Sequence, residues 1–479
     1  MNILFASSEV APFIKTGGLA DVAGSLPQAL ARQGHDVRVI LPLYERIGDE
    51  WRQQMTYLMN FNIHLAWRTP YCGIFELQRD GVTYYFVDNE YYFRRWDIYG
   101  HYDDAERFAF FSRAIIETPG HLGYCPDVIH CNDWHTALVP IYLLYERNEV
   151  PELRDTKSVF TIHNIEYQGR YGRDLLEDVF GLGQGWFHEG MLSYYGDVNL
   201  MKGAIFAADY VTTVSPTYAN ELQYDFYAHG LAGVITENNY KIRGILNGID
   251  VEKFDPATDT RLASQFTADD LRGKAECKKV LQQMAGLDER PDVPIIACIS
   301  RLVGHKGFDL VADALPDIMG LDCQMIVLGT GEWRYEEAFR NAAFQYPNRF
   351  SAQIMYSDTF SAAIYAGADL FLMPSVAEPC GLSQMIAMRY GTLPVVRETG
   401  GLKDTVQPYN QYTGEGNGFT FANINRDEMV HVLSNGVNLY HQNKEMWRKL
   451  MHHAMTTDFS WVKSAGEYDE VYRWVTGKA

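Results

Sequence analysis

The chain has 479 residues, more than one hydrophobic core usually organises, so we expect about two or three domains. Hydrophobic residues make up 47% and charged residues 21%, as in ordinary globular proteins. The formal net charge of −20 argues against a broad surface for nucleic acid or for an anionic membrane, whereas a few cations in a cleft can still bind an anion.

The chain opens with MNILFASSEV, which lacks a basic segment and soon reaches Ser and Glu, so it predicts a strand and not a signal peptide. No uninterrupted apolar run approaches the length that spans a membrane. The seven cysteines are scattered without a C-x-x-C pair, which favours a reducing, cytoplasmic compartment.

The first half of the chain alternates between short apolar runs and helical stretches. Residues 2–7 predict a strand, residues 18–32 a helix that Pro27 should kink or split, and residues 36–41 the next strand. Such short β-branched runs are typical of parallel sheets that are buried on both faces. Further strands are predicted at residues 83–88, 127–130, 158–163 and 210–215.

The second half repeats this alternation, with predicted strands at residues 294–300, 324–331, 349–356, 369–375 and 393–398. Two consecutive series predict an α/β protein with two Rossmann-like, doubly wound domains. We place the domains at residues 1–241 and 242–457, and a helix-like segment at 464–475 could pack on either of them. Two such domains that face each other create a deep cleft at the carboxyl ends of both sheets, so function is expected in loops that follow strands.

The first such loop is KTGGLADV (15–22), which is neither a G-x-G-x-x-G fingerprint nor a P-loop. Gly17 and Gly18 would let backbone N–H groups approach an anion, a helix N-terminus adds partial positive charge, and Lys15 can add a full one. The alternative is a glycine pair that is needed for tight packing beside a solvated lysine.

In the second domain, SRLVGHKGFDL (300–310) places Arg301 and Lys306 between a strand and a helix. Two cations in this loop suit a pyrophosphate, because arginine forms fork-like hydrogen bonds and lysine acts as a point charge. The alternative for either residue is a solvated cation in a loop.

The loop PSVAEPCGLSQMIAMRYG (374–391) follows another predicted strand. The backbone of Gly381, Leu382 and Ser383 offers donors to an anion at the start of a helix. Glu378 beside an anion site is expected to contact something neutral or cationic, such as sugar hydroxyl groups. The alternative for Glu378 is an ordinary capping carboxylate.

The segments HCNDWH (130–135) and TIHNIEYQG (161–169) hold three histidines and one aspartate, but no metal-ligand motif links them. Asp133 and His163 fit sugar hydroxyl groups better, and core or capping roles remain open for His130 and His135. No G-x-S-x-G elbow is present, so serine hydrolysis is not favoured.

Together with GILNGID (244–250), these motifs resemble the bacterial glycogen synthases of the glycogen and starch synthase family, over essentially the whole chain. K-T-G-G-L combined with E-P-C-G-L is characteristic of this group. The resemblance implies the GT-B architecture and a retaining hexosyltransferase that moves glucose from ADP-glucose to the non-reducing end of an α-1,4-glucan such as glycogen. It also implies that no metal or other cofactor is needed, and that the closing helix (458–479) packs back on the first domain.

The resemblance implies catalytic roles for four residues. Glu378 would bind the hydroxyl groups of the donor glucose, and His163 would lie beneath the sugar near the reacting carbon. Arg301 and Lys306 would neutralise the diphosphate as the glycosidic bond breaks. A same-face mechanism is implied, whereas a double displacement would need a carboxylate close to the anomeric carbon, and spacing does not show whether Glu378 or Asp133 reaches it.

Substrate contacts are implied more widely. Lys15, Gly17 and Gly18 would contact the donor phosphates, and Tyr356 would stack on the adenine. The remaining implied contacts are Asp21, Tyr99, Asp133, Asn247, Cys380, Gly381, Leu382 and Ser383.

Three other functions stay open at this point. Another two-Rossmann glycosyltransferase or a sugar-nucleotide epimerase would share the cationic and Glu378 loops but use a different donor or acceptor. A glucan-binding protein without turnover would keep the fold, although Lys15, Arg301 and Glu378 are all present. An NAD-dependent oxidoreductase is weaker, because no dinucleotide fingerprint follows a strand. The oligomeric state is also open.

Overall fold

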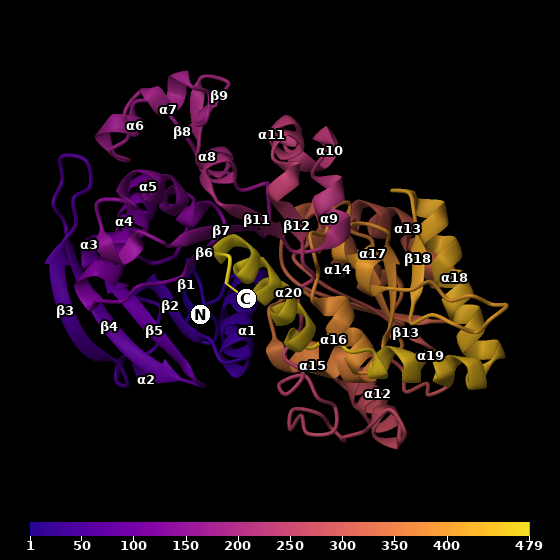
Figure 1. Cartoon of the computed structure of the whole chain (residues 1–479). Coiled ribbons are helices and arrows are strands. Elements are labelled where there is room, and N and C mark those ends of the chain that lie inside the picture. Colours follow the sequence, from indigo (N-terminus) through magenta and orange to yellow (C-terminus); the bar gives the residue numbers. More distant parts are fainter. Residues whose placement is uncertain (479) are drawn as a thin grey trace. The chain divides into compact units, whose positions relative to one another are not determined.

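The computed structural model describes residues 1–478, which form two compact units (Figure 1). Unit 1 comprises Met1–Gly248 together with the closing segment from Trp461 onward, and unit 2 comprises Ile249–Ser460. Each unit is built around one mainly parallel sheet with helices packed on it, so the predicted α/β class with two doubly wound domains is confirmed.

Unit 1 contains a nine-stranded sheet in the order β12-β11-β7-β6-β1-β2-β5-β4-β3. The strands from β12 to β5 are parallel, and β4 and β3 extend the sheet with antiparallel pairs. The strands are β1 (Asn2–Ala6), β2 (Asp36–Pro42), β3 (Thr56–Asn62), β4 (Tyr71–Arg79), β5 (Val82–Asp88), β6 (Val128–Asn132), β7 (Lys157–Ile162), β11 (Tyr210–Thr213) and β12 (Ile242–Gly244).

A small antiparallel sheet, in the order β8-β10-β9, lies outside the main sheet of this unit (Figure 1). Its strands are β8 (Arg170–Tyr171), β9 (Ser193–Tyr194) and β10 (Asp197–Asn199). The helices of unit 1 are α1 (Gly18–Arg32), α2 (Asp49–Arg52), α3 (Glu90–Phe93), α4 (Asp104–Leu122), α5 (Leu138–Glu146), α6 (Leu175–Asp178), α7 (Gly185–His188), α8 (Leu200–Ala207), α9 (Pro216–Glu221), α10 (Asp225–Ala228), α11 (Ala232–Glu237) and α20 (Trp461–Thr476), with 3-10 turns at Trp134–Thr136, Pro151–Leu153 and Asn239–Lys241.

The expected split of the first helix at Pro27 is wrong, because α1 runs without interruption through this residue. Proline removes one helical hydrogen bond at a cost of about 3 kcal/mol. Here Pro27 is itself buried, between the fully buried Leu26 and Leu30. Burial of this apolar face offsets the lost bond.

The domain boundary also differs from the prediction. β12 pairs in parallel with β11, so the segment after residue 241 still belongs to the sheet of unit 1, and the unit ends at Gly248. The sequence indicates a strand within KIRGILNGI (241–249) but not which sheet it joins, because the strand has only three residues, all partly exposed.

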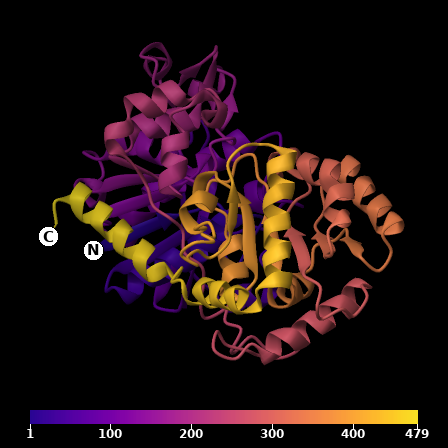
Figure 2. The ribbon, with the colours of Figure 1, turned by 90° about the vertical axis from the view of Figure 1, so that its right-hand side faces the viewer.

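The closing helix α20 belongs to unit 1 and packs against α1. Both ends of the chain lie in this unit (Figure 2). Inside it, the imidazole Nδ1 of His130 shares a hydrogen bond of 2.7 Å with the hydroxyl of Tyr472, and its Nε2 shares one of 2.6 Å with Thr161. His130 is therefore a core residue that anchors the helix.

We expect Tyr472→Phe to destabilise the chain by about 1–3 kcal/mol, because it leaves a ring nitrogen of buried His130 without a partner. Burial lowers the pKa of His130 to about 3, so this ring stays neutral and does not recover the loss by protonation near neutral pH. Urea unfolding of the full chain measures the effect. Tyr240→Phe, at an exposed tyrosine of the same unit, is the control, and equal stability of the two variants would contradict the anchoring role.

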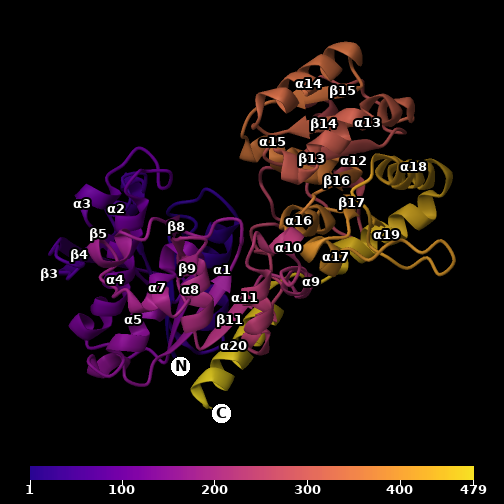
Figure 3. The ribbon, with the colours of Figure 1, turned by 90° about the horizontal axis from the view of Figure 1, so that it is seen from above.

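Unit 2 holds a six-stranded, fully parallel sheet in the order β15-β14-β13-β16-β17-β18. Helices pack against it, with α13 beside α14 and α18, and α12 beside α15 (Figure 3). The strands are β13 (Ile295–Ile299), β14 (Gln324–Leu328), β15 (Phe350–Gln353), β16 (Leu370–Met373), β17 (Leu393–Arg397) and β18 (Phe419–Phe421). The helices are α12 (Arg272–Ala285), α13 (Phe308–Gly320), α14 (Trp333–Gln345), α15 (Asp358–Gly367), α16 (Ser383–Arg389), α17 (Gly400–Thr405), α18 (Arg426–Gln442) and α19 (Lys444–Thr456), with a 3-10 turn at Gly304–Lys306.

Candidate active site

In unit 1, the loop between β1 and α1 is folded around the carboxylate of Glu9. One carboxylate oxygen accepts hydrogen bonds from the backbone N–H of Thr16 at 2.5 Å and of Gly17 at 3.3 Å. The Thr16 hydroxyl lies 3.0–3.1 Å from both oxygens, and the Tyr99 hydroxyl donates to the second oxygen at 3.2 Å. Glu9 is 4% exposed, and its burial raises the pKa of the carboxyl group. The N–H of Gly17 thus has a partner inside the protein, and the contact of Gly17 with the donor phosphates stays a prediction.

Lys15 and Asp21, both predicted site residues, contact each other. The Lys15 ammonium lies 2.7 Å from the Asp21 carboxylate in the first turn of α1, and the lysine side chain is 45% exposed. Asp21 therefore orients Lys15 and leaves part of its ammonium open to solvent.

The two glycines of this loop are not explained by packing. A Cβ built on Gly17 or Gly18 meets no atom within 4 Å, and the Gly17 backbone is extended, a conformation open to any residue. Gly24 in the same helix is different, since its Cβ would lie 2.5 Å from the Ala11 carbonyl oxygen. The tight-packing alternative is therefore disfavoured, and the space beside Gly17 and Gly18 is open to a ligand.

The loops after β6 and β7 bring Asp133 and His163 together. These strands pair with Asn132 opposite Thr161, so both loops start at the same edge of the sheet. The Asp133 carboxylate accepts the backbone N–H of His163 at 2.8 Å and that of Asn164 at 3.4 Å. Asp133 is buried and has φ of 56°, a conformation that non-glycine residues rarely adopt and that concentrates at functional sites. Burial raises the pKa of Asp133 to about 7.

His163 is held as a neutral imidazole. Asn132 donates through its amide nitrogen to the Ala6 carbonyl at 3.0 Å, so its oxygen accepts from Nε2 of His163 at 2.8 Å. Burial lowers the pKa of His163 to about 3. With Nε2 as the donor, Nδ1 carries the lone pair.

His135 does not join a polar cluster. Its ring stacks on Tyr99 with centroids 4.5 Å apart and packs on Phe108, which favours the core role left open by the sequence. Among residues 1–478, no group of three or more His, Cys, Asp and Glu side chains is arranged to hold a metal ion.

In unit 2, Lys306 and Glu378 form the centre of the site. The Lys306 ammonium lies 2.7 Å from the Glu378 carboxylate, which also accepts the Ser375 hydroxyl at 3.1 Å. The Glu378 side chain is 9% exposed and that of Lys306 is 20% exposed. Glu378 thus has the cationic partner that its position beside an anion site requires.

Two glycines allow this approach. Gly307, next to Lys306, has φ of 79°, and a Cβ there would lie 2.0 Å from the Pro374 carbonyl oxygen. Gly400 has φ of 44°, and a Cβ there would lie 1.9 Å from the Glu378 carbonyl oxygen. Any side chain at either position would push the Lys306 and Glu378 loops away from the ends of their strands.

The segment after Glu378 has a buried and an accessible part. Cys380 is 5% exposed, whereas Gly381, Leu382 and Ser383 are partly exposed at the start of α16. Gln384 is fully buried and donates to the Cys380 and Gly381 carbonyls at 3.2 and 3.0 Å. Its replacement would therefore disturb this loop.

The remaining predicted residues stand apart from this centre. Arg301 is exposed after β13, and its side chain has no hydrogen bond or ion pair with any residue that the structure describes. Tyr356 is 80% exposed beyond β15, and its hydroxyl donates to Asp358 at 3.0 Å. Asn247, in unit 1, is 5% exposed, and within residues 1–478 its amide oxygen has no hydrogen-bond partner.

Comparison with known families matches both units. The description "Starch synthase catalytic domain" matches residues 2–237, and "Glycosyl transferases group 1" matches residues 281–449. A glycogen synthase of Desulforamulus reducens is 48% identical over 473 residues, covering 99% of this chain and 98% of the relative. One of Clostridium novyi is 46% identical over 473 residues and covers 98% of both.

The chain belongs to the glycogen and starch synthase family.

Solved structures agree with this assignment. The catalytic domain of Starch Synthase IV from Arabidopsis thaliana, bound to ADP and acarbose, matches with a TM-score of 0.92 at 36% identity and covers 99% of both chains. A sucrose-phosphate synthase from Thermosynechococcus elongatus, at 16% identity and a TM-score of 0.62 over 100% of this chain and 99% of that one, supports the fold alone. The chain is thus a glycosyltransferase with the GT-B fold.

For this family member the predicted residues fall into two groups. In unit 2 they follow β13, β15 and β16, whose carboxyl ends share one edge of the parallel sheet, and Lys306 and Glu378 touch although 72 positions separate them. In unit 1 they follow β1, β6, β7 and β12, with Tyr99 added from the loop before α4. The unit 2 group is Arg301, Lys306, Tyr356, Glu378, Cys380, Gly381, Leu382 and Ser383, and the unit 1 group is Lys15, Gly17, Gly18, Asp21, Tyr99, Asp133, His163 and Asn247.

Sequence reasoning missed two charged residues that shape these groups. Glu9 folds the KTGG loop, and Arg397 donates to the Ser375 carbonyl at 2.7 Å and to the Val376 carbonyl at 2.5 Å, which fixes the backbone before Glu378. Both lie at or just beyond the end of a strand, where the other candidates were sought, and RETGG (397–401) repeats the glycine pair of KTGG. This repeated glycine pair after a charged residue is the sequence signal that could have indicated Arg397.

Proposed function

We propose that the chain transfers glucose from ADP-glucose to the non-reducing end of an α-1,4-glucan such as glycogen, with retention of anomeric configuration and release of ADP. The observation that carries the proposal is the contact between Lys306 and Glu378 in a loop cluster that also holds Arg301. Cleavage of a sugar–diphosphate bond builds negative charge on the leaving group, and preorganised cations stabilise that charge. The similarity to a synthase bound to ADP and acarbose supports this choice of donor and acceptor.

We propose the following roles for the site residues. Arg301 and Lys306 bind the diphosphate, and Glu378, oriented by Lys306 and Ser375, accepts hydrogen bonds from the donor sugar. We assign the sugar side of unit 1 to His163, Asp133 and Tyr99, and the adenine to Tyr356. These cations supply the positive charge for the leaving group, so we propose that no metal or other cofactor takes part.

Retention is best explained by a same-face mechanism. Glu378 is bound by Lys306 and Ser375, and Asp133 accepts backbone N–H groups from the loop after β7. Both carboxylates are engaged in the protein, which disfavours either one as the nucleophile of a covalent double displacement. We therefore assign the departing phosphate as the base that assists the acceptor hydroxyl.

The test is incorporation of radiolabelled glucose into glycogen from ADP-glucose, with UDP-glucose assayed alongside. We expect label in the polymer from ADP-glucose, released again by an exo-acting α-1,4-glucosidase. Absence of incorporation from both donors would overturn the proposal, and epimerised nucleotide sugar as the only product would support the epimerase instead.

Lys15→Gln should raise the KM for ADP-glucose about tenfold and change kcat less, because it removes one charged hydrogen-bond donor. Steady-state kinetics at saturating glycogen measures both constants. Asp21→Asn is the matched variant, since it keeps the lysine and loses only its 2.7 Å partner, and should have a smaller effect. An unchanged KM in Lys15→Gln would rule out a phosphate contact by this residue.

The location of the protein stays a prediction. All seven cysteines are free, and within residues 1–478 no helix is long and apolar enough to cross a membrane. A cytoplasmic compartment remains the expectation from cysteine usage.

A further inference from the structure

Helix α4 carries a buried ion pair in its first turn. The Asp104 carboxylate lies 2.6 Å from the guanidinium of Arg107, which is completely buried and also donates to the Tyr92 carbonyl at 2.7 Å. Within residues 1–478, Nη2 of Arg107 has no hydrogen-bond partner. Attraction inside a buried ion pair often only offsets the cost of taking both charges out of water, and an unsatisfied donor adds to that cost. The groups that the pair holds in place therefore explain it better than stability does.

The ion pair holds the backbone on both sides of Tyr99. Nη1 of Arg107 donates to the carbonyl of Ile98 at 3.1 Å, and the Asp104 carboxylate accepts the backbone N–H of Gly100 at 2.9 Å. The peptide bonds before and after Tyr99 are thus both tied to α4. The direction in which the tyrosine side chain leaves its loop is fixed with them.

Tyr99 joins two loops of the candidate site. Its hydroxyl donates to the Glu9 carboxylate at 3.2 Å, and Glu9 shapes the loop that carries Lys15. Its ring stacks on that of His135, with centroids 4.5 Å apart, and His135 follows Asp133 by two positions. A shift of Tyr99 would therefore disturb both loops. Misplacement of a site group by about 1 Å can lower the rate of an enzyme about 100-fold.

We propose that Asp104 and Arg107 are positioning residues for glucose transfer, which hold Tyr99 and, through it, the loops that carry Lys15 and Asp133. They act through the backbone, and Arg107 is buried away from any substrate. For the identity of the reaction this proposal rests on the proposed function, whereas the hold on Tyr99 rests on the hydrogen bonds alone.

Arg107→Met is the main test, because it keeps an unbranched apolar stem and removes the hydrogen bonds that the guanidinium donates. Arg107→Lys keeps the charge beside Asp104, but a single nitrogen on a shorter side chain does not reproduce the arginine fork. Arg113→Met is the matched control, since Arg113 lies on the same helix and its ion-pair partners, Glu117 and Glu146, are outside the candidate site.

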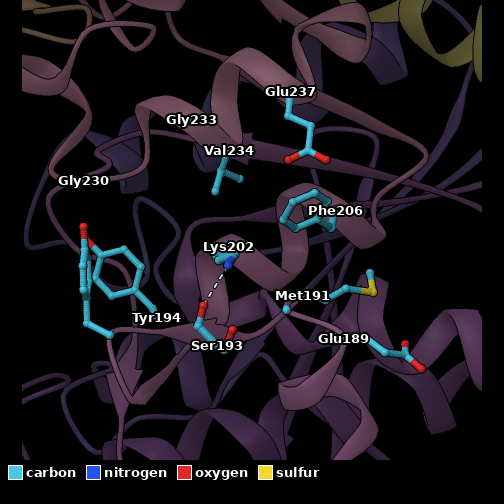
Figure 4. Close-up of a pocket in the computed structure, with 12 residues that line it drawn as sticks. Glu189, Met191, Ser193, Tyr194, Lys202, Phe206, Gly230, Gly233, Val234 and Glu237 are labelled. Carbon is cyan, nitrogen blue, oxygen red and sulfur yellow. Dashed lines mark hydrogen bonds between the residues drawn. The ribbon is translucent and has the colours of Figure 1, made fainter.

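The substitutions lie apart from a cavity of about 590 Å³ in the same unit. This cavity is between α8, α11 and the β9–β10 hairpin, where Lys202 donates to the Ser193 carbonyl at 2.7 Å (Figure 4). All the residues that line it are at positions 189–237, whereas the substitutions are at positions 99–113. A change in the variants therefore does not come from a residue that lines this cavity.

The first readout is kcat and KM for ADP-glucose at saturating glycogen, scaled to the folded fraction that circular dichroism gives for each variant. We expect Arg107→Met to lower kcat/KM by about 10- to 100-fold, the cost of a displaced site group. Arg107→Lys should recover part of this loss, and Arg113→Met should match the wild type.

A double variant shows whether Arg107 acts through Tyr99. Effects of independent residues multiply, whereas effects that pass through a shared group do not. We expect Arg107→Met to lower kcat/KM little further in a chain that already carries Tyr99→Ala. A loss as large as in the wild-type background would place the effect of Arg107 elsewhere in the fold, and the proposal would fail.

The second readout is independent of enzyme activity. Hydrogen exchange of the full chain, followed by mass spectrometry, reports the N–H of Gly100, which Asp104 accepts, and those of Thr16 and Gly17, which Glu9 accepts. We expect exchange in the peptides that contain these residues to be about tenfold faster in Arg107→Met, as for loss of one hydrogen bond. Arg113→Met should leave it unchanged.

Wild-type kinetics in folded Arg107→Met would overturn the positioning role, and wild-type exchange at Gly100 would overturn the hold on Tyr99. Either result leaves glucose incorporation by the wild-type chain intact, so this failure is distinct from failure of the proposed function. Equal losses and equally fast exchange in Arg113→Met would show a general loosening of α4 and would contradict the proposal too. If Arg107→Met does not fold, wild-type values of both readouts in Arg107→Lys would overturn it instead.

Discussion

Lys306→Ala is expected to lower kcat by about two to three orders of magnitude. The substitution removes a cation that the proposed reaction needs as negative charge builds on the leaving diphosphate. Loss of one preorganised group of this kind typically lowers kcat by this factor. It also leaves the nearly buried Glu378 carboxylate without its 2.7 Å partner, so the Ser375 hydroxyl alone orients the residue that should bind the donor sugar. Arg301→Ala, which removes an exposed cation with no partner of its own among the described residues, should lower kcat by a similar factor and spare stability.

The measurement is kcat and KM for ADP-glucose at saturating glycogen, together with the thermal midpoint of each variant. Lys279→Ala is the control, because this exposed lysine of unit 2 has a distant 3.9 Å ion pair with Glu289 and no place in the site. A kcat for Lys306→Ala close to that of the control would contradict the assigned role. Loss of activity in Lys306→Ala together with an equal loss of folded protein would also fail to support the role. Arg301→Ala is therefore measured beside it, because that substitution should lower kcat without loss of stability.

The sequence placed Lys306 and Glu378 in two loops that each follow a strand, and it did not show that these loops are neighbours. Parallel strands place their carboxyl ends at one edge of a sheet, and β13 pairs directly with β16, so the two loops lie side by side. The order of the strands within the sheet, which the chain order does not reveal, therefore brings Lys306 to Glu378. The glycines that permit the contact, Gly307 and Gly400, follow the same logic.

The sequence could not show which hydrogen-bond partners the polar side chains near the site would have. Glu9 lies only six positions before Lys15, yet nothing in the pattern indicates that its carboxylate is buried and turned towards the N–H of Gly17. Likewise Arg397 lies within the predicted strand at residues 393–398, and nothing in that pattern indicates that its guanidinium fixes the backbone before Glu378. Hydrogen-bond direction depends on side-chain placement, which periodicity does not carry.

The misplaced elements have a similar cause. β3 has an exposed or partly exposed residue at every position, so it does not show the apolar alternation on which strand prediction depends. Pro27 was read by its local rule, whereas burial on both sides of it decides that α1 continues. In each case tertiary packing outweighs the local pattern.

Glu9→Ala is expected to lower kcat/KM by about 10- to 100-fold, the cost of a site group displaced by about 1 Å. The Glu9 carboxylate holds the N–H groups of Thr16 and Gly17 and also the Tyr99 hydroxyl, so its loss frees the loop that carries Lys15. Glu9→Gln is the matched variant. Its amide oxygen can accept the two N–H groups, and its amide nitrogen can donate to the hydroxyls of Thr16 and Tyr99.

The pair of variants separates positioning from charge. If Glu9 positions the loop, the glutamine variant keeps most of the activity that the alanine variant loses. Burial raises the pKa of Glu9 in the folded chain above its ordinary value. At a pH above that ordinary value, ionisation of the carboxyl group therefore costs more in the folded chain than in the unfolded chain and lowers the stability of the fold. A neutral amide removes that cost, and the thermal midpoint of Glu9→Gln at neutral pH should equal or exceed that of the wild type. Equal, severe loss of kcat/KM in both variants would show that the negative charge itself takes part in the reaction, whereas wild-type kinetics in Glu9→Ala would show that the KTGG loop needs no such support.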